Sequence, residues 1–198
     1  MVKQSFGRAT ALIAALAFGC GPVAAQEQVQ VVIDRGLTDD LPYTAIFPNT
    51  LQSVDDGNPE TILTLQHPSA PLQCDVFAVA GAPEGWTAEG ALDALDVAGV
   101  EAAWAPSFQG FRITGRSVAR FANGPALFYE GVSDSSPFNL PMSIVHAEAV
   151  DGGRTYAIEC LLAQEISAEA RPMVDFIIAN FSTTSDGECC IDPADDRG

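Results

Sequence analysis

The first half of the chain is dominated by short runs in which apolar and polar residues alternate. In residues 28–35 the apolar Val29, Val31 and Ile33 occupy every second position, which is typical of a strand with one buried face. A second extended run follows, and two more flank a proline-containing turn at residues 67–71. These three strands are predicted at residues 42–47, 61–66 and 73–80.

Between residues 87 and 104 the spacing of apolar residues changes to that of a helix. Thr87 has the side chain of a helix N-cap, and Gly99 is placed where a helix can end. The apolar positions between them share one helical face: Ala88, Ala91, Leu92 and Leu95. We expect one helix here, with a further turn at residues 100–104.

The second half of the chain predicts two hairpins. Asn123 and Gly124 both accept the positive φ angles of a tight turn, so residues 116–122 and 126–132 are expected to pair. A second turn, at residues 151–154, joins two further strands, which are predicted at residues 142–150 and 155–163.

A final helix is expected to begin at Ser167 as its N-cap. Its apolar stripe has the spacing i, i+3, i+4, i+7 and consists of Val174, Ile177, Ile178 and Phe181. This stripe predicts a helix docked on the sheet, with Ile178 almost fully buried. Asp175 and Asn180 lie away from the centre of the stripe and are expected to face water.

This order of elements defines an α+β domain with a mostly antiparallel sheet, one helix after the first strands and one at the end. We assign residues 26–185 to this single domain and residues 186–198 to an acidic C-terminal tail.

Residues 1–25 have the layout of a secretory signal peptide. Two basic residues precede a short apolar run, and Val23 and Ala25 supply small side chains for cleavage before Gln26. Cys20 raises the alternative of a lipid anchor, but Ala17 and Phe18 fit a lipoprotein signal poorly, so soluble export is favoured. The apolar run is much shorter than the ~20 residues of a transmembrane helix. We therefore expect a periplasmic or secreted protein.

The charge of the chain narrows its range of partners. It has 9 basic and 26 acidic residues, for a formal charge of −17. Removal of Lys3 and Arg8 with the signal peptide leaves seven basic residues against 26 acidic ones, for a formal charge of −19. Such a surface repels nucleic acids and anionic membranes, so the expected partner is a protein in the periplasm.

Several short segments resemble the PsbP/DcrB-like family, and together they span about residues 28–182. The matching segments are residues 43–48, 88–95, 123–126, 155–160 and 176–182. The resemblance implies an antiparallel sheet sandwiched between helices. Members of that family include a photosystem assembly subunit, bacterial secreted proteins and lipoproteins, and a small-GTPase-binding factor. They share no catalytic constellation, so the resemblance describes shape and not a reaction.

Four cysteines follow the signal peptide, and an even number in an exported chain indicates disulfides. Cys74 and Cys160 both lie in predicted strands, and we expect them to be bridged, or within bridging range at a Cα separation of about 4.4–6.8 Å. Cys189 and Cys190 are adjacent in the tail. A bridge between such neighbours would be strained. The alternative is that one of the two links the tail to the domain.

His146 and Glu159 form the best acid–base pair that the sequence offers. The turn at residues 151–154 places them opposite each other on neighbouring strands, with their side chains on one sheet face. A carboxylate beside an imidazole can raise the His pKa and transfer a proton. A structural cross-strand pair is favoured, because no nucleophile or third catalytic group accompanies the two residues.

Arg112, Arg116 and Arg120 are three of the seven basic residues left after signal cleavage. On a strand all three would share one face, and arginine's planar guanidinium suits an acidic partner. A solvated strand face balanced by nearby carboxylates is the favoured alternative.

The sequence predicts neither a metal nor a cofactor. Asp55 and Asp56 stand beside Gly57 and Asn58, but the spacing of a calcium-binding loop and its distal glutamate are missing. The acidic pairs at residues 39–40 and 195–196 are likewise expected to be solvated loops. The expected function is therefore a non-enzymatic periplasmic binding or assembly protein. The alternative is a small-molecule-binding protein or hydrolase that uses His146 and Glu159.

Overall fold

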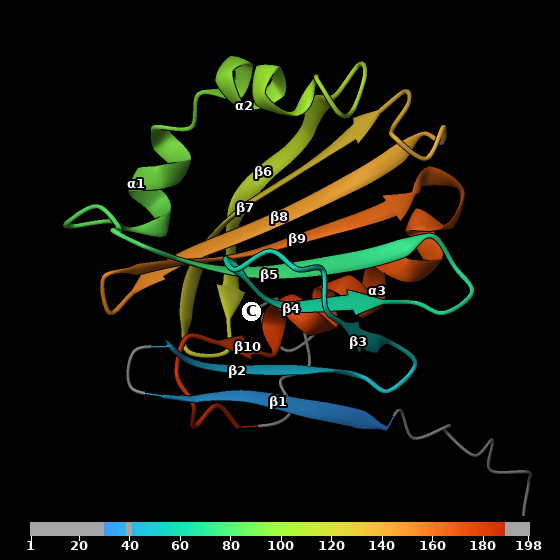
Figure 1. Cartoon of the computed structure of the whole chain (residues 1–198). Coiled ribbons are helices and arrows are strands. Elements are labelled where there is room, and N and C mark those ends of the chain that lie inside the picture. The colour runs from blue at the N-terminus through green and yellow to red at the C-terminus, as the bar shows by residue number, and fades with distance from the viewer. Residues whose placement is uncertain (1–29, 39–40, 189–198) are drawn as a thin grey trace, which may run out of the picture.

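The computed structural model describes residues 30–38 and 41–188 of the chain. Within them the strands form two antiparallel sheets (Figure 1). The large sheet has seven strands in the order β3 (Gln52–Val54), β4 (Thr61–Gln66), β5 (Leu72–Ala80), β9 (Arg154–Ala163), β8 (Met142–Asp151), β7 (Gly124–Ser133) and β6 (Arg112–Phe121). The small sheet has the order β1 (Val31–Thr38), β2 (Leu41–Pro48) and β10 (Phe181–Ser182).

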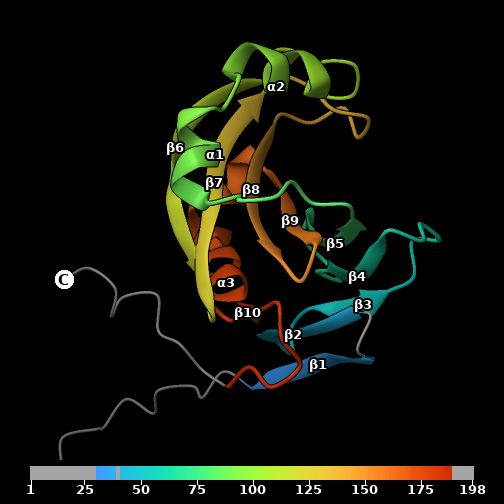
Figure 2. The ribbon, with the colours of Figure 1, turned by 90° about the vertical axis from the view of Figure 1, so that its left-hand side faces the viewer.

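Helices lie on both faces of the large sheet, but they cover it incompletely. Helices α1 (Ala88–Asp93) and α2 (Val97–Trp104) lie over its β6–β7 end (Figure 2). Helix α3 (Ser167–Ala179), which follows the short 3-10 turn η1 (Gln164–Ile166), packs on the opposite face, between the large sheet and β2. The α+β class is confirmed, but the protein is richer in sheet than the expected helix-covered sandwich.

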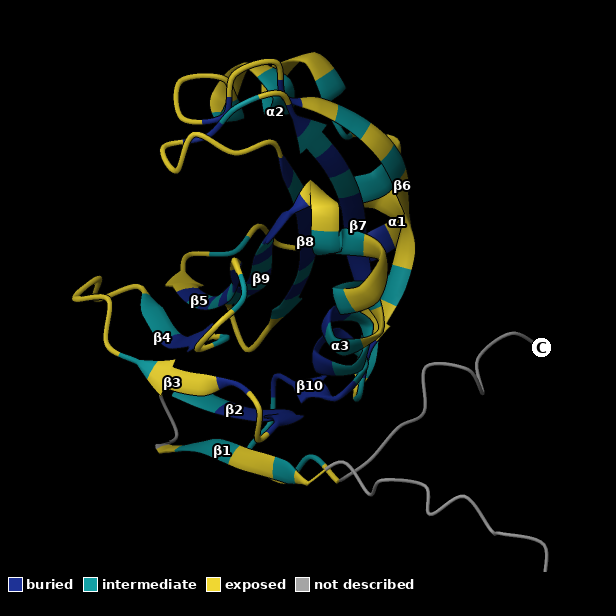
Figure 3. Cartoon of the chain, turned by 90° about the vertical axis from the view of Figure 1, so that its right-hand side faces the viewer, coloured by how far each residue is buried: buried dark blue, intermediate teal, exposed yellow. Residues whose placement is uncertain are grey.

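The main core lies between α3 and the two sheets. Figure 3 shows buried positions gathering on α3, β2 and β10. All four residues of the predicted stripe, Val174, Ile177, Ile178 and Phe181, are buried, and Ile178 is 4% exposed. Phe181, however, does not belong to the helix as predicted, because α3 ends at Ala179 and Phe181 begins β10. Asn180 is also buried, so the expectation that it faces water is wrong; its amide Nδ2 donates to the carbonyl of Phe176 at 3.0 Å.

Both predicted hairpins are present, but the first turn differs from the prediction. Phe121 pairs with Gly124, so Ala122 and Asn123 form the turn between β6 and β7, and neither Asn123 nor Gly124 takes the expected positive φ. Gly152 and Gly153 do take positive φ angles between β8 and β9. Thr87 caps α1 as expected, since its side chain accepts a hydrogen bond from the amide of Gly90 at 3.0 Å.

Two helix boundaries differ from those predicted. Gly99 does not end a helix, because α1 already stops at Asp93 and Asp96 caps a separate helix that contains Gly99. Ser167 is the first residue of α3 and not its N-cap. Its hydroxyl donates to the carbonyl of Gln164 at 3.1 Å.

The predicted disulfide between Cys74 and Cys160 is present in the main core. The two residues are directly opposite each other on β5 and β9, and their Cα atoms are 4.0 Å apart, slightly less than the expected range. Cys189 and Cys190 lie outside the described residues.

The chain after β10 runs along the small sheet. The guanidinium of Arg35 donates to the carbonyls of Ser185 and Gly187, the latter at 3.0 Å. The hydroxyl of Thr44 donates to the carbonyl of Thr184 at 2.8 Å. Contacts with the sheet therefore continue to Gly187. Of the helices that the structure describes, none has the length and apolar character to cross a membrane.

Candidate functional site

His146 lies at the centre of a row of polar residues that crosses the large sheet. Its register partner on β9 is Glu159, as predicted, and its Nδ1 is 3.1 Å from a carboxylate oxygen of that residue. Because paired residues share a sheet face, both side chains lie on the face that carries α1 and α2. The residue is only 7% exposed.

A second carboxylate, which the sequence reasoning missed, reaches the other ring nitrogen. Nε2 of His146 is 3.5 Å from an oxygen of Glu148, two positions further along β8. Residues at i and i+2 on a strand share a face, so this spacing was a usable signal. The side chains of Glu148 and Glu159 are 27% and 28% exposed, so both carboxylates are partly buried with the imidazole.

Tyr129 covers the imidazole from β7. Their rings stack at a centroid distance of 4.4 Å and an interplanar angle of 12°. The hydroxyl of Tyr129 accepts a hydrogen bond from the indole Nε1 of Trp104 in α2, at 3.3 Å. Trp104 belongs to a small second core with Phe108 and Phe111. The ring of His146 is therefore held on one side by the packing of α2.

The row continues onto β5 and β4. Asp75 is the register partner of Glu159, and Thr64 is the partner of Asp75. The hydroxyl of Thr64 donates to Asp75 at 2.7 Å, and the amide of Gln73 donates to both of its oxygens, at 3.0 and 2.8 Å. These donors offset the repulsion that two adjacent carboxylates would otherwise cause.

The electrostatics of the row favour a charged imidazole. Burial lowers the pKa of His146, but the hydrogen bonds and charges of Glu148 and Glu159 more than offset it, so the pKa lies above its ordinary value. Burial raises the pKa of Tyr129 to about 12, so its hydroxyl keeps its proton. Burial also raises the pKa of Asp75, although the hydrogen bonds from Thr64 and Gln73 act against this.

This arrangement suits an ion-pair network better than proton transfer to a substrate. A general base needs a free nitrogen lone pair, whereas both nitrogens of His146 are beside carboxylates. The described side chains that contact His146 are the carboxylates of Glu148 and Glu159 and the ring of Tyr129, and none of them is a serine, threonine or cysteine nucleophile. In the described part of the chain, no group of three or more His, Cys, Asp or Glu side chains is arranged to hold a metal ion.

The three arginines of β6 do not share a face, contrary to expectation. A bulge between Ile113 and Gly115 shifts the register, so Arg116 pairs with Tyr129 but Arg112 pairs with Val132 on the opposite face. Arg112 forms an exposed ion pair with Asp134 at 3.2 Å. Arg116 and Arg120 remain together on the face of His146.

The acidic turn at residues 55–58 satisfies its own backbone. Asp55 accepts from the amide of Gly57 and Asp56 from the amide of Asn58, each at 2.9 Å. These contacts form ordinary Asx turns. The other two acidic pairs, at residues 39–40 and 195–196, lie outside the described residues.

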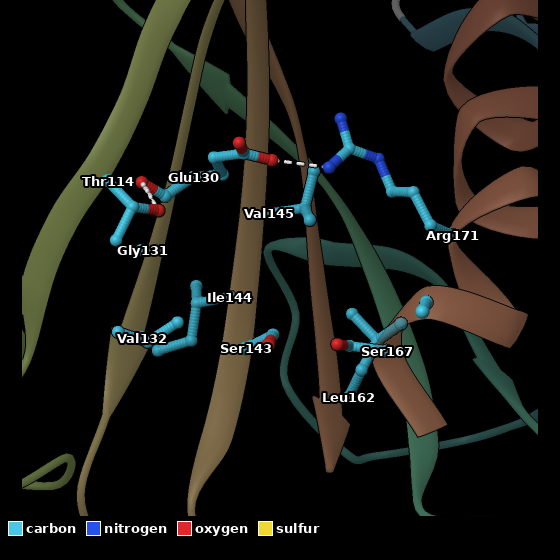
Figure 4. A pocket seen from close by; sticks show the side chains of 11 residues that line it. Thr114, Glu130, Gly131, Val132, Ser143, Ile144, Val145, Leu162, Ser167 and Arg171 are labelled. Atoms are coloured by element: carbon cyan, nitrogen blue, oxygen red, sulfur yellow. Dashed lines mark hydrogen bonds and ion pairs between the residues drawn. The ribbon is translucent and has the colours of Figure 1, made fainter. Parts of the chain in front are cut away.

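Neither the cavity beside the start of α3 nor the one near α1 includes His146 or Glu159. The first, of about 240 Å³, lies beside the start of α3 (Figure 4). Arg171 reaches from α3 to Glu130 on β7 across one end, beside Val145, and Leu162 and Ser167 line the other part. The polar groups at that end satisfy each other, since Arg171 also binds Asp175 at 2.6 Å. The second cavity is larger and more acidic, at about 350 Å³.

No family model and no curated protein matches this chain. Among solved structures, the cyanobacterial PsbP (CyanoP) of Synechocystis sp. PCC 6803 is similar, with a TM-score of 0.53 and 14% identity over 82% of this chain and 96% of that chain. LpqN of Mycobacterium tuberculosis, a protein involved in cell envelope biogenesis, has a TM-score of 0.48 and 10% identity over 80% and 86% of the two chains. The Ran-binding protein Mog1p of Saccharomyces cerevisiae has a TM-score of 0.48 and 8% identity over 72% and 82%.

The similarity to cyanobacterial PsbP extends over most of both chains and shows that this protein has a PsbP-like fold. The resemblance found in the sequence is therefore confirmed at the level of fold.

Proposed function

We propose that this protein is an exported, periplasmic accessory protein that binds a protein partner and catalyses no reaction. The observation that carries the proposal is the state of His146, which is 7% exposed and has both ring nitrogens beside carboxylates. The best acid–base candidate of the chain is thus part of its internal packing. The PsbP-like fold adds no catalytic constellation to it.

Two features support export. The first 25 residues have the layout of a signal peptide. The core contains a disulfide between Cys74 and Cys160, and such bonds persist in oxidising compartments such as the periplasm.

The proposed contact surface is the outer edge of β6, the last strand of the large sheet. No strand that the structure describes pairs with that edge. Near its start, the amide of Ile113 is already bound by the side chain of Glu101 at 2.9 Å, so the open stretch is residues 114–120. An exposed edge of this kind can accept an extended segment of another protein as an additional strand.

The positive charge of β6 indicates which kind of partner segment this edge would bind. Arg116 is exposed in the middle of the open stretch, and no ion pair with another described residue holds it. Val118 follows it on the same face and is 36% exposed. We therefore expect the partner to contribute an extended segment with acidic side chains. Because the rest of this protein is strongly acidic, such a segment would be attracted only to this basic strand.

Site-specific photocrosslinking in the periplasm tests the proposal. A crosslinker at Ser117 is expected to give one discrete adduct, and Arg116→Glu is expected to abolish it. Arg154→Glu makes the same charge change on β9 and serves as the matched control, which should keep the adduct. His146→Gln should keep it as well. Absence of the adduct, or equal loss with Arg154→Glu, would overturn the proposed surface.

The alternative function, a small-molecule binder or hydrolase that uses His146 and Glu159, gains no support from the geometry. Neither described cavity reaches the pair. If His146→Gln lost the adduct while its melting temperature stayed unchanged, His146 and Glu159 would again be candidates for a functional role.

A further inference from the structure

A cavity of about 350 Å³ lies at the end of the large sheet where two hairpins meet the start of α1. It is bounded by the turns of the β6–β7 and β8–β9 hairpins, by residues 86–89 and by Thr183 after β10 (Figure 1). Its volume falls within the range of small-molecule sites. It includes none of the residues of the row around His146.

The side chains that line the cavity are apolar, neutral polar or negatively charged. Trp86 contributes a half-buried indole ring, and Pro125 contributes an exposed apolar surface. Glu89 and Asp151 contribute two exposed carboxylates. The lining residues include no lysine, arginine or histidine, although Arg154 is the register partner of Asp151.

The neutral polar groups of the cavity are already engaged. Thr183 donates to Oδ2 of Asp151 at 2.6 Å and accepts from Nδ2 of Asn123 at 2.7 Å. The amide of Thr183 donates in turn to Oδ1 of Asn123 at 3.2 Å. Thr87 is the N-cap of α1. This network fixes one oxygen of Asp151 and positions the carboxylate.

Three groups stay available to a ligand. Oδ1 of Asp151 and the carboxylate of Glu89 accept no hydrogen bond from a described residue, and the indole nitrogen of Trp86 donates none. Carboxylates accept hydrogen bonds only, and the face of an indole ring attracts positive charge. A ligand that matches the two carboxylates and the face of the indole ring carries hydrogen-bond donors, a positive charge and a short apolar body.

We propose that this cavity binds an organic cation, an ammonium or guanidinium group on an alkyl stem. The charged head contacts Glu89 and Asp151, and the stem lies against Trp86 and Pro125. Such a group belongs either to a free amine or to a basic side chain of a protein. The proposal does not depend on the edge of β6, which contributes neither Arg116 nor the open stretch to the cavity.

Fluorescence titration of the exported, oxidised protein tests the proposal. Trp104→Phe leaves Trp86 as the single indole, because the chain has two tryptophans. Agmatine and N-acetylarginine amide at low salt are expected to change the Trp86 emission in a saturable way. N-acetylaspartate, an anion, should cause no saturable change.

Matched carboxylate variants locate the binding. Glu89→Gln and Asp151→Asn are each expected to weaken agmatine binding about three- to fivefold. The asparagine still accepts the hydrogen bond of Thr183, so the fold is retained. Asp93→Asn removes one carboxylate from α1 outside the cavity and should leave the affinity unchanged.

The outcomes decide whether the proposal holds and whether the cation belongs to a free amine or to a protein side chain. Equal binding of agmatine and N-acetylarginine amide identifies a free amine as a sufficient ligand, whereas tighter binding of the amide identifies a protein side chain. Absence of saturation with both cations overturns the proposal. An effect of Asp93→Asn equal to that of Glu89→Gln overturns it too, since binding would then follow the overall charge.

Discussion

The side chain of His146 shows how single residues set the electrostatics of this fold. A buried imidazole is tolerated because carboxylates lie beside both of its nitrogens, and Tyr129 excludes water from its ring. The neighbouring carboxylate of Asp75 in β5 also has partners, because it accepts hydrogen bonds from Thr64 in β4 and from Gln73 in its own strand. Removal of one member would leave a partly buried charge without its partner, which costs more than an exposed ion pair contributes.

The stability that His146 contributes should depend on pH. Its pKa is raised in the folded state, so the folded protein binds the proton more tightly than the unfolded chain. This contribution is fully present below the ordinary pKa of about 6.5 and is lost as pH rises through the folded pKa. Urea unfolding of the wild type and of His146→Gln from pH 5 to 9 measures it.

The difference in unfolding free energy between the two proteins is expected to shrink with rising pH. His67, the other histidine, is present in both and cancels in the comparison. A difference that stays constant across this range would show that the imidazole stabilises the fold by packing alone.

At the scale of elements, the β8–β9 hairpin follows from its two turn glycines, and the packing of α3 follows from its apolar stripe. The β6–β7 hairpin forms where it was predicted, but its turn residues are Ala122 and Asn123 and not Asn123 and Gly124. The hydrogen-bonded turns also fix His146 opposite Glu159.

The bulge in β6 leaves Thr114 without a register partner, and its only sequence signal, Gly115 inside the strand run, is as typical of a close backbone approach as of a bulge. The sequence also could not show Tyr129 beside His146, since the β7–β8 pairing depends on a loop of eight residues without a distinctive turn signal.

Helix α3 should depend on Ile178 far more than on Asp175. Ile178→Ala is expected to lower the free energy of unfolding by about 2–5 kcal/mol, through lost burial and a residual cavity. Asp175 is half-exposed and pairs with Arg171 at i, i+4, so Asp175→Ala should cost about 0.5 kcal/mol. Urea unfolding of the oxidised protein compares them, and equal effects would contradict the docked helix.

The disulfide joins β5 to β9 across 86 residues of sequence. Closing so long a loop restricts the unfolded chain, so the double variant Cys74→Ala, Cys160→Ala is expected to lose about 4 kcal/mol of unfolding free energy. Chemical denaturation of the oxidised wild type and the double variant gives this value. A change below about 1 kcal/mol would show that the strand pairing alone determines the stability of this region.

For the whole molecule, the proposed export rests on redox chemistry, because the buried disulfide between Cys74 and Cys160 is typical of an oxidising compartment. The PsbP-like architecture leaves the edge of β6 and the acidic cavity near α1 as separate surfaces on one domain.

The proposed export makes a prediction about the mature N-terminus. Val23 and Ala25 place small side chains where signal peptidase requires them, so the periplasmic protein should begin at Gln26. N-terminal sequencing with intact-mass measurement decides this, and the mass should also show the bridged pair of cysteines.

Ala25→Arg puts a large charged side chain at the cleavage position and should leave the precursor uncut. Ala9→Ser, a small change before the apolar run, should still give Gln26. A mature chain that begins with a lipid-modified Cys20 would replace the soluble protein with a membrane-anchored one, because an acylated terminus holds the domain at the bilayer.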